Sequence, residues 1–443
     1  MRRPERCASI KIPACDENAA RESGETMSRA VYIASAVRTP IGKFGGGLAE
    51  LSAADLGVIA VRAALERAFG RAPEERAPGG VEENRLKAPA TATCRVDEVI
   101  MGNARPAGVG PNVARQIAWR AGLGDDVPAF TVNMACASGL RAILLGWQQI
   151  MLGNAEVIVA GGAEAMSRVP YLVEARWGMK MGHQPLVDAM YRDGFFCPLA
   201  QMVMGETAEL LAREFAIGRE EQDAFAVESH RRAAWAMESC RFSREIVPVE
   251  RTDAKGRAMR IEKDEHVRPE ATLEALGKLA PAFSKDGTIT AGNSSGLTDA
   301  SSAVVLVSEE RLQGLAAAPL ARIVDATVAA VEPRRMGVGP VPACRKLEER
   351  TGWKTGDYDA VELNEAFAAQ VLACDRELHF DRARLNPNGG AIALGHPIGA
   401  TGARMVTTLA HELCGRATQG ARRGLATLCV SGGLGLALAL EAA

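Results

Sequence analysis

The chain has 443 residues, of which 47% are hydrophobic and 24% are charged, and its formal net charge is −2. These values are typical of a globular protein with room for two or three well-packed domains. A charge balance so close to neutral gives no indication of a nucleic acid partner or an anionic membrane surface. No uninterrupted apolar run approaches the roughly 20 residues of a membrane span, so the sequence predicts no membrane association.

The first residues and one internal stretch lack the periodicity of helices or strands. Residues 1–26 are polar and irregular, without the apolar stretch of a secretory signal, so we expect a disordered leader before a folded region that starts at Met27. Residues 71–95 are rich in Pro, Ala, Glu and Arg, which is typical of a surface insertion. The ten cysteines contain no Cys-x-x-Cys pair and no zinc-module spacing. We therefore expect reduced thiols, no bound metal and a cytoplasmic location.

Strands and helices alternate along residues 27–165, the predicted N-terminal half. The expected elements are strands at 30–34, 96–102, 130–132 and 155–160 and helices at 53–67, 111–122 and 138–152. Residues 292–317 are expected to complete this half. Residues 166–291 are predicted to form an inserted, lid-like loop domain with a polar helix at 219–237. Six of the 15 methionines fall between Met166 and Met204, a cluster that suits an adaptable apolar tunnel.

The predicted C-terminal half, residues 318–443, repeats the order of the first. A strand at 360–363 is expected to lead into a helix capped by Asn364, and a further helix to follow His396. Strands at 425–429 and 434–440 are expected to end the chain. The repetition suggests an internal duplication, and the alternation predicts an α/β fold with parallel or mixed sheets covered by helices.

Three segments far apart in the sequence carry residues with chemical potential. Cys136 lies in Asn-Met-Ala-Cys-Ala-Ser-Gly, between a strand and a helix, where the helix dipole favours a thiolate. His396 lies in Gly-His-Pro-Ile-Gly near the start of another helix, and Cys429 ends a late strand before several glycines. A histidine can act as the base for a cysteine, and a second thiol can move another proton. The pattern predicts covalent acyl transfer through Cys136.

Six sequence blocks in one order make the chain resemble the thiolase family from about Met27 to its end. The blocks are Asn133 to Gly139, Val159 to Ser167, Gly292 to Gly296, Asn364 to Phe367, Gly395 to Gly399 and Cys429 to Gly435. The resemblance implies duplicated βαβαβαββ halves that form α-β-α-β-α layers, with an inserted loop domain. It also implies a homodimer or homotetramer.

The resemblance also implies a role for each site residue. Cys136 is acylated, His396 takes its proton, and Cys429 exchanges the α-proton of acetyl-CoA. Asn364 orients a water that forms one oxyanion hole with the histidine, and backbone N–H groups of Cys136 and Ser431 form the other.

Coenzyme A and acetyl-CoA are expected as substrates rather than as permanently bound cofactors. By resemblance, Ser295, Ala366 and Met204 lie near the bound substrate. Arg268 is a candidate for the adenosine phosphates because guanidinium groups suit phosphate geometry, although a solvated surface arginine is about equally expected. No Walker-type or Gly-x-Gly-x-x-Gly loop follows a strand, so neither ATP nor a dinucleotide is implied.

Two positions depart from patterns seen in the family. Val203 replaces a histidine that biosynthetic members carry before Met-Gly, which puts strict two-carbon specificity in doubt. Ser431 replaces a glycine of many members, a costly change if the position needs a positive φ.

The sequence thus predicts an acetyl-CoA C-acyltransferase that cleaves 3-ketoacyl-CoA with CoA and runs the reverse condensation. Acetoacetyl-CoA is slightly favoured over longer substrates. The alternatives are a broad-chain degradative thiolase, a decarboxylating ketoacyl synthase that does not need Cys429, and a non-catalytic acyl-CoA-binding protein.

Overall fold

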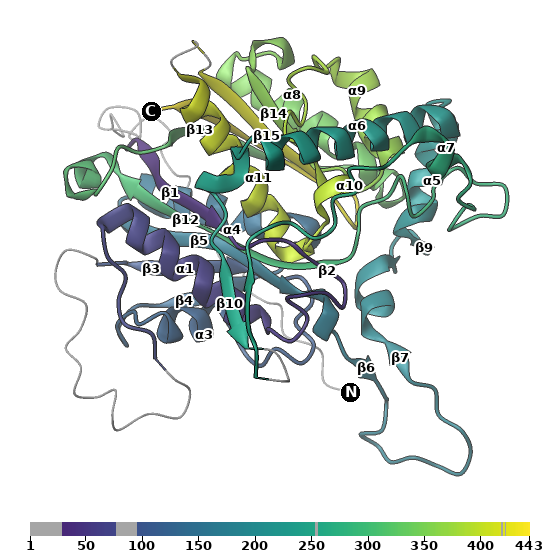
Figure 1. The fold of residues 1–443 in the computed structure, drawn as a ribbon, viewed down its shortest axis with the longest axis horizontal. Coiled ribbons are helices and arrows are strands. Elements are labelled where there is room, and N and C mark those ends of the chain that lie inside the picture. The colour runs from purple at the N-terminus through teal and green to yellow at the C-terminus, as the bar shows by residue number, and fades with distance from the viewer. Residues whose placement is uncertain (1–28, 77–94, 253–255, 418–419, 421) are drawn as a thin grey trace, which may run out of the picture.

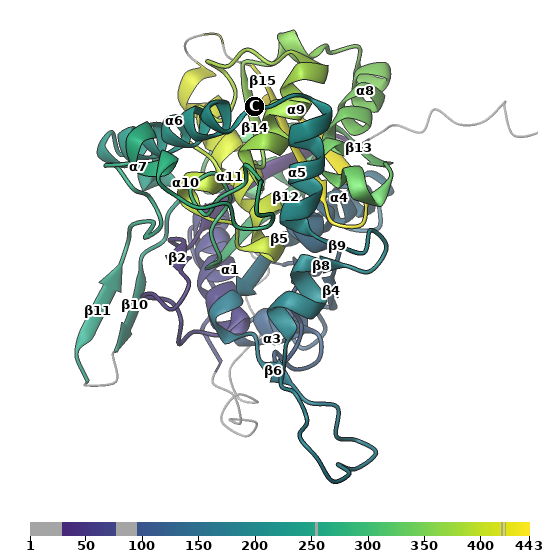
Figure 2. The same cartoon turned by 90° about the vertical axis from the view of Figure 1, so that its right-hand side faces the viewer.

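A computed structural model describes residues 29–76, 95–252, 256–417, 420 and 422–443. The predicted leader at 1–26 and most of the predicted insertion at 71–95 lie outside these residues. Figures 1 and 2 show the chain in two perpendicular views. Among the described residues, no helix combines the length and apolar character needed to cross a membrane.

The N-terminal half forms one part of a mixed sheet and its covering helices. Its elements are β1 (Val31–Arg38), β2 (Gly42–Lys43), α1 (Ala53–Phe69), β3 (Glu98–Gly102), α3 (Val113–Arg120), β4 (Ala129–Val132), α4 (Ser138–Met151), β5 (Val157–Ala165) and β12 (Thr298–Ser308). Helix α1 shows how local sequence sets the boundaries. The Ser52 hydroxyl accepts the Asp55 N–H and the Asp55 carboxylate accepts the Ser52 N–H, while Gly70 ends the helix at φ 75°.

The C-terminal half repeats this arrangement. Its elements are β13 (Ala321–Ala330), α8 (Pro340–Thr351), β14 (Ala360–Leu363), α9 (Ala368–Leu378), α10 (Ala391–Leu394), α11 (Ile398–Arg416), β15 (Arg423–Val430) and β16 (Leu434–Ala442). The order β1-β12-β5-β3 in the first half matches β13-β16-β15-β14 in the second. In both halves the first two pairings are antiparallel and the third is parallel. This shared pattern supports the predicted duplication, and a short β1–β13 pairing joins the two halves.

The helices form layers around the sheet, as Figures 1 and 2 illustrate. α1 and α3 pack on the outer face of the first half, and α8 and α9 pack on the outer face of the second. α4 and α11 lie between the halves, in a core that contains residues from β5, β12, β15 and β16. Successive strand residues face opposite layers: Ile158 joins this central core, and Val159 joins the outer one. The layered α/β fold expected from the sequence is therefore present.

Glycines allow the two central helices to meet at their N-terminal ends. A side chain at Gly402 of α11 would collide with the Leu140 backbone of α4, and one at Gly162 of β5 would collide with the backbone of Gly399 and Ala400. Because backbone atoms cannot rotate away, only residues without a Cβ permit this approach. The two helix starts that carry Cys136 and His396 are thereby held together.

The region between β5 and β12 is built from short hairpins and helices. Its elements are β6 (Tyr171–Leu172), β7 (Val187–Asp188), β8 (Phe196–Cys197), β9 (Met202–Val203), α5 (Met204–Glu214), α6 (Arg219–Glu238), β10 (Val249–Thr252), β11 (Ala258–Ile261) and α7 (Leu273–Gly277). The loop between β6 and β7 projects far from the body in both views. The division of the chain into 27–165, 166–291 and 318–443 stays a prediction.

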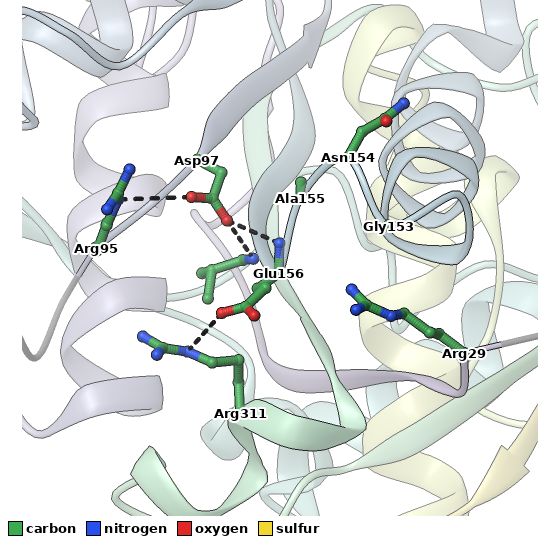
Figure 3. A pocket seen from close by; sticks show the side chains of 9 residues that line it. Arg29, Arg95, Asp97, Gly153, Asn154, Ala155, Glu156 and Arg311 are labelled. Carbon is green, nitrogen blue, oxygen red and sulfur yellow. Dashed lines mark hydrogen bonds and ion pairs between the residues drawn. The ribbon is translucent and has the colours of Figure 1, made fainter.

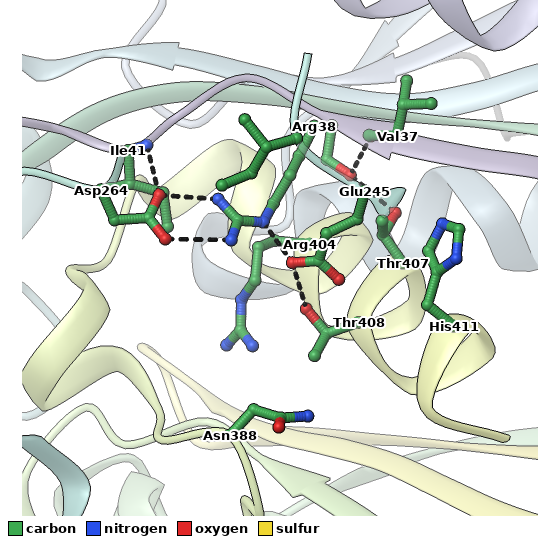
Figure 4. A network of polar contacts seen from close by, with 12 residues as sticks. Val37, Arg38, Ile41, Glu245, Asp264, Asn388, Arg404, Thr407, Thr408 and His411 are labelled. Atoms are coloured by element: carbon green, nitrogen blue, oxygen red, sulfur yellow. Dashed lines mark hydrogen bonds and ion pairs between the residues drawn. The ribbon is translucent and has the colours of Figure 1, made fainter. Parts of the chain in front are cut away.

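A buried ionic network ties this region to the first strand (Figure 4). The Arg38 guanidinium donates to the Glu245 carboxylate at 2.6 Å and to both oxygens of Asp264 at 2.7 and 3.0 Å. The Thr408 hydroxyl of α11 also donates to Glu245, at 3.2 Å. Such buried pairs contribute little net stability, but breaking one leaves an uncompensated charge. The network therefore fixes where the inserted region meets β1 and α11.

Two local expectations were wrong. Asn364 does not cap a helix: α9 begins later, after Phe367, and both Asn364 side-chain amide atoms lack a hydrogen-bond partner. The strand expected to end before Gly161 continues through Gly162 to Ala165, because its partner β12 pairs with it along this whole length. Cys429 likewise lies inside β15, one residue before its end.

We expect Gly162→Ala to destabilise the protein by about 1–3 kcal/mol, because the added methyl would overpack against backbone atoms of α11. Urea unfolding followed by circular dichroism would measure the loss. Gly277→Ala is the matched control, since Gly277 ends the exposed helix α7 and nothing lies within 4 Å of an added Cβ. Equal stability of the two variants would contradict the proposed close contact.

Candidate active site

One cavity brings together the three chemically active side chains. It has a volume of about 510 Å³ and is lined by Cys136, His396, Cys429 and Ser431, among others. Cys136 comes from the N-terminal half, and the other three come from the C-terminal half. The cavity therefore forms where the two halves meet through α4 and α11.

Cys136 lies in a tight 3₁₀ turn, Ala135–Ala137, directly before α4. The Ser138 hydroxyl holds this turn, because it accepts the Met134 N–H at 2.9 Å and donates to the Ala135 carbonyl at 2.7 Å. Burial raises the pKa of the Cys136 thiol, whereas the Arg105 guanidinium and the backbone N–H groups of Ser431 and Cys136 act to lower it. The resting residue is a thiol surrounded by groups that stabilise its thiolate.

His396 is buried, and its imidazole is held in one orientation. Its Nδ1 lies 2.6 Å from the Thr401 hydroxyl, and that hydroxyl donates to the Pro397 carbonyl at 3.0 Å. Because the single Thr401 proton is used on Pro397, Thr401 accepts the hydrogen bond from Nδ1–H. Nε2 is then unprotonated, and it has no hydrogen-bond partner in the described structure.

The surroundings keep this imidazole neutral. Burial and, to a smaller extent, the positive charges of Arg105 and Arg404 lower the pKa of His396 to about 3. A neutral imidazole with a free Nε2 is the form that can accept a proton from a thiol.

Cys429 is buried at the cavity wall, near the end of β15. Burial raises its pKa well above the usual range, and the neighbouring Cys136 adds to this effect. Cys429 therefore rests as a thiol with a proton to give. Two thiols and one neutral imidazole in one cavity can provide a nucleophile, a base and an acid.

The other predicted site residues divide into two groups. Ser295, Ala366 and Met204 line the cavity, and the Ser295 N–H donates to the Ala366 carbonyl at 3.0 Å. Arg268 is exposed and does not line it. Asn364 is not a lining residue either, but it is fully buried and its amide group has two donors and an acceptor without partners.

The six methionines between Met166 and Met204 divide between the surroundings of the cavity and solvent, and Met166 and Met190 pack in one apolar cluster with Cys136. Among the six methionines between Met166 and Met204, only Met204 lines the cavity, while Met179 and Met181 are exposed on the projecting loop. Met179 and Met181 face solvent because the loop between β6 and β7 extends away from the body of the protein.

Val203 and Ser431, the two departures from family patterns, both line the cavity. Ser431 does not adopt a positive φ, whereas the following residues Gly432 and Gly433 do, at 89° and 86°. The serine therefore causes no backbone strain, because the glycines beside it make the turn.

Sequence reasoning missed Arg105, which lines the cavity and is 5% exposed. Arg105 follows the end of β3, beside the strand that leads to Cys136. A single arginine after a strand belongs to no recognisable motif. Only its place at the carboxyl edge of a parallel strand pair could have indicated a site.

A second hollow, shown in Figure 3, has a different character. Its volume is about 350 Å³, and its arginines are paired with carboxylates, as in Arg95–Asp97 and Arg311–Glu156. It is lined by none of the cysteines or histidines, so we do not regard it as a catalytic site.

Comparison with known proteins agrees with this geometry. Residues 81–310 match the thiolase N-terminal domain and residues 317–442 match the thiolase C-terminal domain. The chain belongs to the thiolase family.

Its relatives include enzymes with closely similar length. An acetyl-CoA acetyltransferase from Pseudomonas aeruginosa is 47% identical, over 93% of this chain and 98% of the relative. The crystal structure of the Bacillus anthracis acetyl-CoA acetyltransferase superposes with a TM-score of 0.85 at 43% identity, covering 94% of this chain and 99% of that one. The crystal structure of human mitochondrial 3-ketoacyl-CoA thiolase in complex with CoA superposes with a TM-score of 0.83 at 38% identity, covering 94% of this chain and 98% of that one.

The buried neutral imidazole has a measurable effect on stability. With a folded-state pKa of about 3, His396 stays neutral at pH 5, whereas the unfolded chain binds a proton below its pKa of about 6.5. Stability therefore falls as the pH decreases from 7 to 5. We expect His396→Asn to reduce this fall by about 1–2 kcal/mol.

Urea unfolding at pH 7 and pH 5 measures how much stability the native protein and the His396→Asn variant each lose between these pH values. His183→Asn is the control, because His183 is exposed on the projecting loop. An unchanged pH dependence in the His396 variant would show that this imidazole is protonated in the folded protein.

Proposed function

We propose that this protein is an acetyl-CoA C-acyltransferase that cleaves 3-ketoacyl-CoA with CoA and catalyses the reverse Claisen condensation. The observation that carries the proposal is the convergence of the Cys136 thiol, the Cys429 thiol and the free Nε2 of His396 on one cavity. The names of the relatives support the same reaction class.

In the proposed cleavage, His396 Nε2 takes the proton of Cys136 and the thiolate attacks the 3-keto carbon. The bond between C2 and C3 breaks, and its electron pair remains on the acetyl-CoA fragment as an enolate. Cys429 protonates that enolate at C2, which releases acetyl-CoA and leaves an acyl group on Cys136. The raised pKa of Cys429 suits this step, because it keeps the proton in place until a strong base forms.

The second half of the reaction regenerates the enzyme. The thiol of free CoA loses its proton to the Cys429 thiolate and attacks the acyl carbon. The bond to Cys136 Sγ breaks, and the shortened acyl-CoA leaves. The Cys136 thiolate then recovers its proton from His396, so both cysteines and the histidine return to their starting forms.

Two kinds of oxyanion form during the reaction, one on the tetrahedral intermediate and one on the enolate. Each is proposed to have its own site. Backbone N–H groups of Cys136 and Ser431 would stabilise the tetrahedral intermediate on the acyl group. The unpartnered Asn364 amide, through a water, and the protonated Nε2 of His396 would stabilise the enolate oxygen. Losing one such donor typically costs about 10²–10³ in rate.

Coenzyme A belongs to the proposal as a substrate. Ser295, Ala366 and Met204 line the cavity and are proposed to contact the pantetheine chain. The exposed Arg268 is proposed to meet the adenosine phosphates outside the cavity. The solved human relative that contains CoA supports this class of ligand.

Acetoacetyl-CoA is the favoured substrate, because the similar proteins include several acetyl-CoA acetyltransferases. A broader degradative thiolase is the second candidate. Val203, an apolar cavity residue, favours it by removing a polar feature from the wall. Comparing thiolysis of acetoacetyl-CoA with six- to twelve-carbon 3-ketoacyl-CoAs distinguishes the two.

Replacing each of the two cysteines is expected to remove a different part of the activity. Cys429→Ala should lose more than 10³-fold in thiolysis of acetoacetyl-CoA, yet it should still become acylated on Cys136 by acetyl-CoA. Cys136→Ala should lose both activities. The ultraviolet absorbance of acetoacetyl-CoA follows thiolysis, and intact-protein mass spectrometry follows acylation of Cys136.

Cys240→Ala is the control, since Cys240 is an exposed cysteine that does not line the cavity. A Cys429 variant with full activity would instead favour the ketoacyl synthase. A native protein whose Cys136 is never acylated would favour the acyl-CoA-binding protein.

We also propose that the chain forms a homodimer or homotetramer in the cytoplasm. The projecting loop between β6 and β7 exposes several large apolar side chains, including Trp177 at 97% and Met181 at 103%. Exposed apolar groups concentrated on one projecting segment are typical of contact surfaces. The seven described cysteines are free thiols, in keeping with a reducing compartment.

Replacing Trp177 and Met181 together by serine is expected to reduce the size of the assembly, as measured by analytical ultracentrifugation. Trp235→Ser is the control, because Trp235 is a partly exposed tryptophan on α6. An unchanged assembly in the loop variant would place the contact elsewhere.

A further inference from the structure

The proposed chemistry gives no role to Glu164, an acidic residue near the cavity that is completely buried. Glu164 lies near the end of β5, the strand that pairs with β3 on one side and with β12 on the other. Burying a carboxylate is costly unless hydrogen bonds compensate for the lost water. The hydrogen-bond partners of Glu164 therefore indicate what this side chain contributes.

Four N–H donors surround the Glu164 side chain. Its Oε1 accepts the Arg105 backbone N–H at 3.2 Å and the Asn103 side-chain amide at 2.9 Å. Its Oε2 accepts the backbone N–H groups of Ala104 at 3.0 Å and Gly399 at 2.8 Å. Burial raises the pKa of Glu164, whereas the Arg105 guanidinium and the backbone donors act to lower it. Because each oxygen faces two donors, neither has room for a proton, and the side chain is held as a carboxylate.

The four donors come from two segments that lead directly to the reacting groups. Residues 103–105 follow β3, and Arg105 lines the cavity and acts electrostatically on both Cys136 and His396. Gly399 belongs to the first turn of α11, three residues after His396. One carboxylate therefore joins the segment that carries the cation of the cavity to the helix start that follows the base.

Glycines on three elements enclose the other side of the Gly399 peptide. Its carbonyl oxygen lies 2.8, 2.9 and 2.0 Å from the points that a Cβ would occupy at Gly102, Gly139 and Gly162. These glycines belong to the end of β3, the first turn of α4 and β5. Close packing thus determines how near α11 comes to its neighbours, and the hydrogen bond to Glu164 holds its N–H side.

The orientation of the imidazole depends on the same helix turn. The Thr401 hydroxyl of α11 accepts the hydrogen bond from His396 Nδ1 at 2.6 Å. The backbone N–H of His396 is held separately, because it donates to the Gly296 carbonyl at 2.9 Å. A shift of the first turn of α11 would move Thr401 relative to this backbone, and Nε2 would no longer point in its present direction.

We propose that Glu164 is a positioning residue for the thiolase reaction, which holds the first turn of α11 so that His396 Nε2 stays directed at the Cys136 thiol. This inference rests on the proposed thiolase activity and adds no chemical step to it. Glu164 does not line the cavity, so it acts through His396 and not on the substrate. A carboxylate is needed because it alone accepts N–H groups at both of its oxygens.

The first test replaces the carboxylate by an amide of the same shape. In Glu164→Gln one oxygen becomes an NH₂ group, which faces two N–H donors instead of accepting from them. We expect the kcat for thiolysis of acetoacetyl-CoA to fall by about 10- to 100-fold, the factor that corresponds to losing a hydrogen bond to a charged group. The KM for CoA should change little, because Glu164 lies outside the cavity proposed to hold the pantetheine chain.

Asp97→Asn is the matched control. The Asp97 carboxylate accepts the backbone N–H groups of Glu156 and Val157 at 2.8 and 2.9 Å, so it also holds the backbone of β5, but at the opposite end of the strand. We expect this variant to keep the native kcat. Equal kcat losses in both variants, or a native kcat in Glu164→Gln, would overturn the inference. A native protein without any thiolysis would instead overturn the thiolase proposal itself.

A pH profile separates a displaced base from a damaged fold. When His396 no longer takes the Cys136 proton, attack depends on thiolate that forms without it, and the thiolate fraction rises with pH. The rate deficit of Glu164→Gln in acylation by acetyl-CoA should therefore shrink from pH 7 to pH 9. Losing the Glu164 charge would by itself favour the thiolate beside Arg105, so it cannot cause the slower reaction. A deficit of the same factor at every pH would mean a smaller folded fraction and would overturn the inference.

Glu164→Asp keeps the inference testable if Glu164→Gln does not fold. The shorter side chain retains the negative charge, but it cannot reach all four donors at once. We expect a kcat below that of the native protein, with a deficit that again shrinks as the pH rises. A folded Glu164→Asp protein with native kcat would show that the charge suffices without the hydrogen bonds, and it would overturn the inference.

Discussion

The arrangement of this protein depends on the contact between the N-terminal ends of α4 and α11. Each helix belongs to one half of a duplicated fold, and each follows a residue that lines the cavity. Gly162 and Gly402 bring the backbones close enough for the two helix starts to touch. The Glu164 carboxylate then ties the start of α11 to the segment after β3, because it accepts the N–H of Gly399 in α11 and those of Ala104 and Arg105. Movement of α11 would break the hydrogen bond from Gly399 to a buried carboxylate, which no solvent could replace.

This contact also explains the electrostatics of the cavity. Because the helix starts are deep between the two halves of the sheet, His396 and Cys429 are almost completely removed from solvent. Burial opposes charge on both, so the histidine rests neutral and the thiol rests protonated. Cys136 is less completely buried, and a cation and two backbone N–H groups counteract the effect of burial on its thiol pKa. Residues of similar chemistry thus acquire different protonation properties from their surroundings alone.

Much of this could be predicted from the sequence, because the features involved are local. Apolar periodicity gave the positions of α1, α4 and α11, and Gly-rich blocks around Cys136, His396 and Cys429 indicated where backbone turns near a ligand. Asn364 was misassigned because an asparagine after a strand is also the usual signal of a helix start. Its actual setting, a buried amide without partners, is produced by tertiary packing and has no local signature.

Arg105 could not be recognised for a related reason. Nothing in its local sequence distinguishes it from a surface arginine, and Gly194, which packs against its guanidinium, lies in a different region of the chain. For the projecting loop the error was the reverse, because residues expected in the interior are exposed. Its methionines have the composition of a core, yet the segment extends into solvent and contacts little of its own chain. Composition indicates that an apolar surface must be covered, but it does not show whether the same chain or a partner covers it.

The position of α11 has a consequence for how the chain is made. From Ile398 to Ala410 every residue of this helix is buried, and it packs against strands from both halves of the sheet. It is synthesised only after every element of the first half. Until it leaves the ribosome, the first half has an apolar sheet face and the flank of α4 without their partner. Since nascent chains grow at only about 5–20 residues per second, that face is exposed for a substantial time. The nascent protein therefore needs protection from aggregation until α11 has been synthesised.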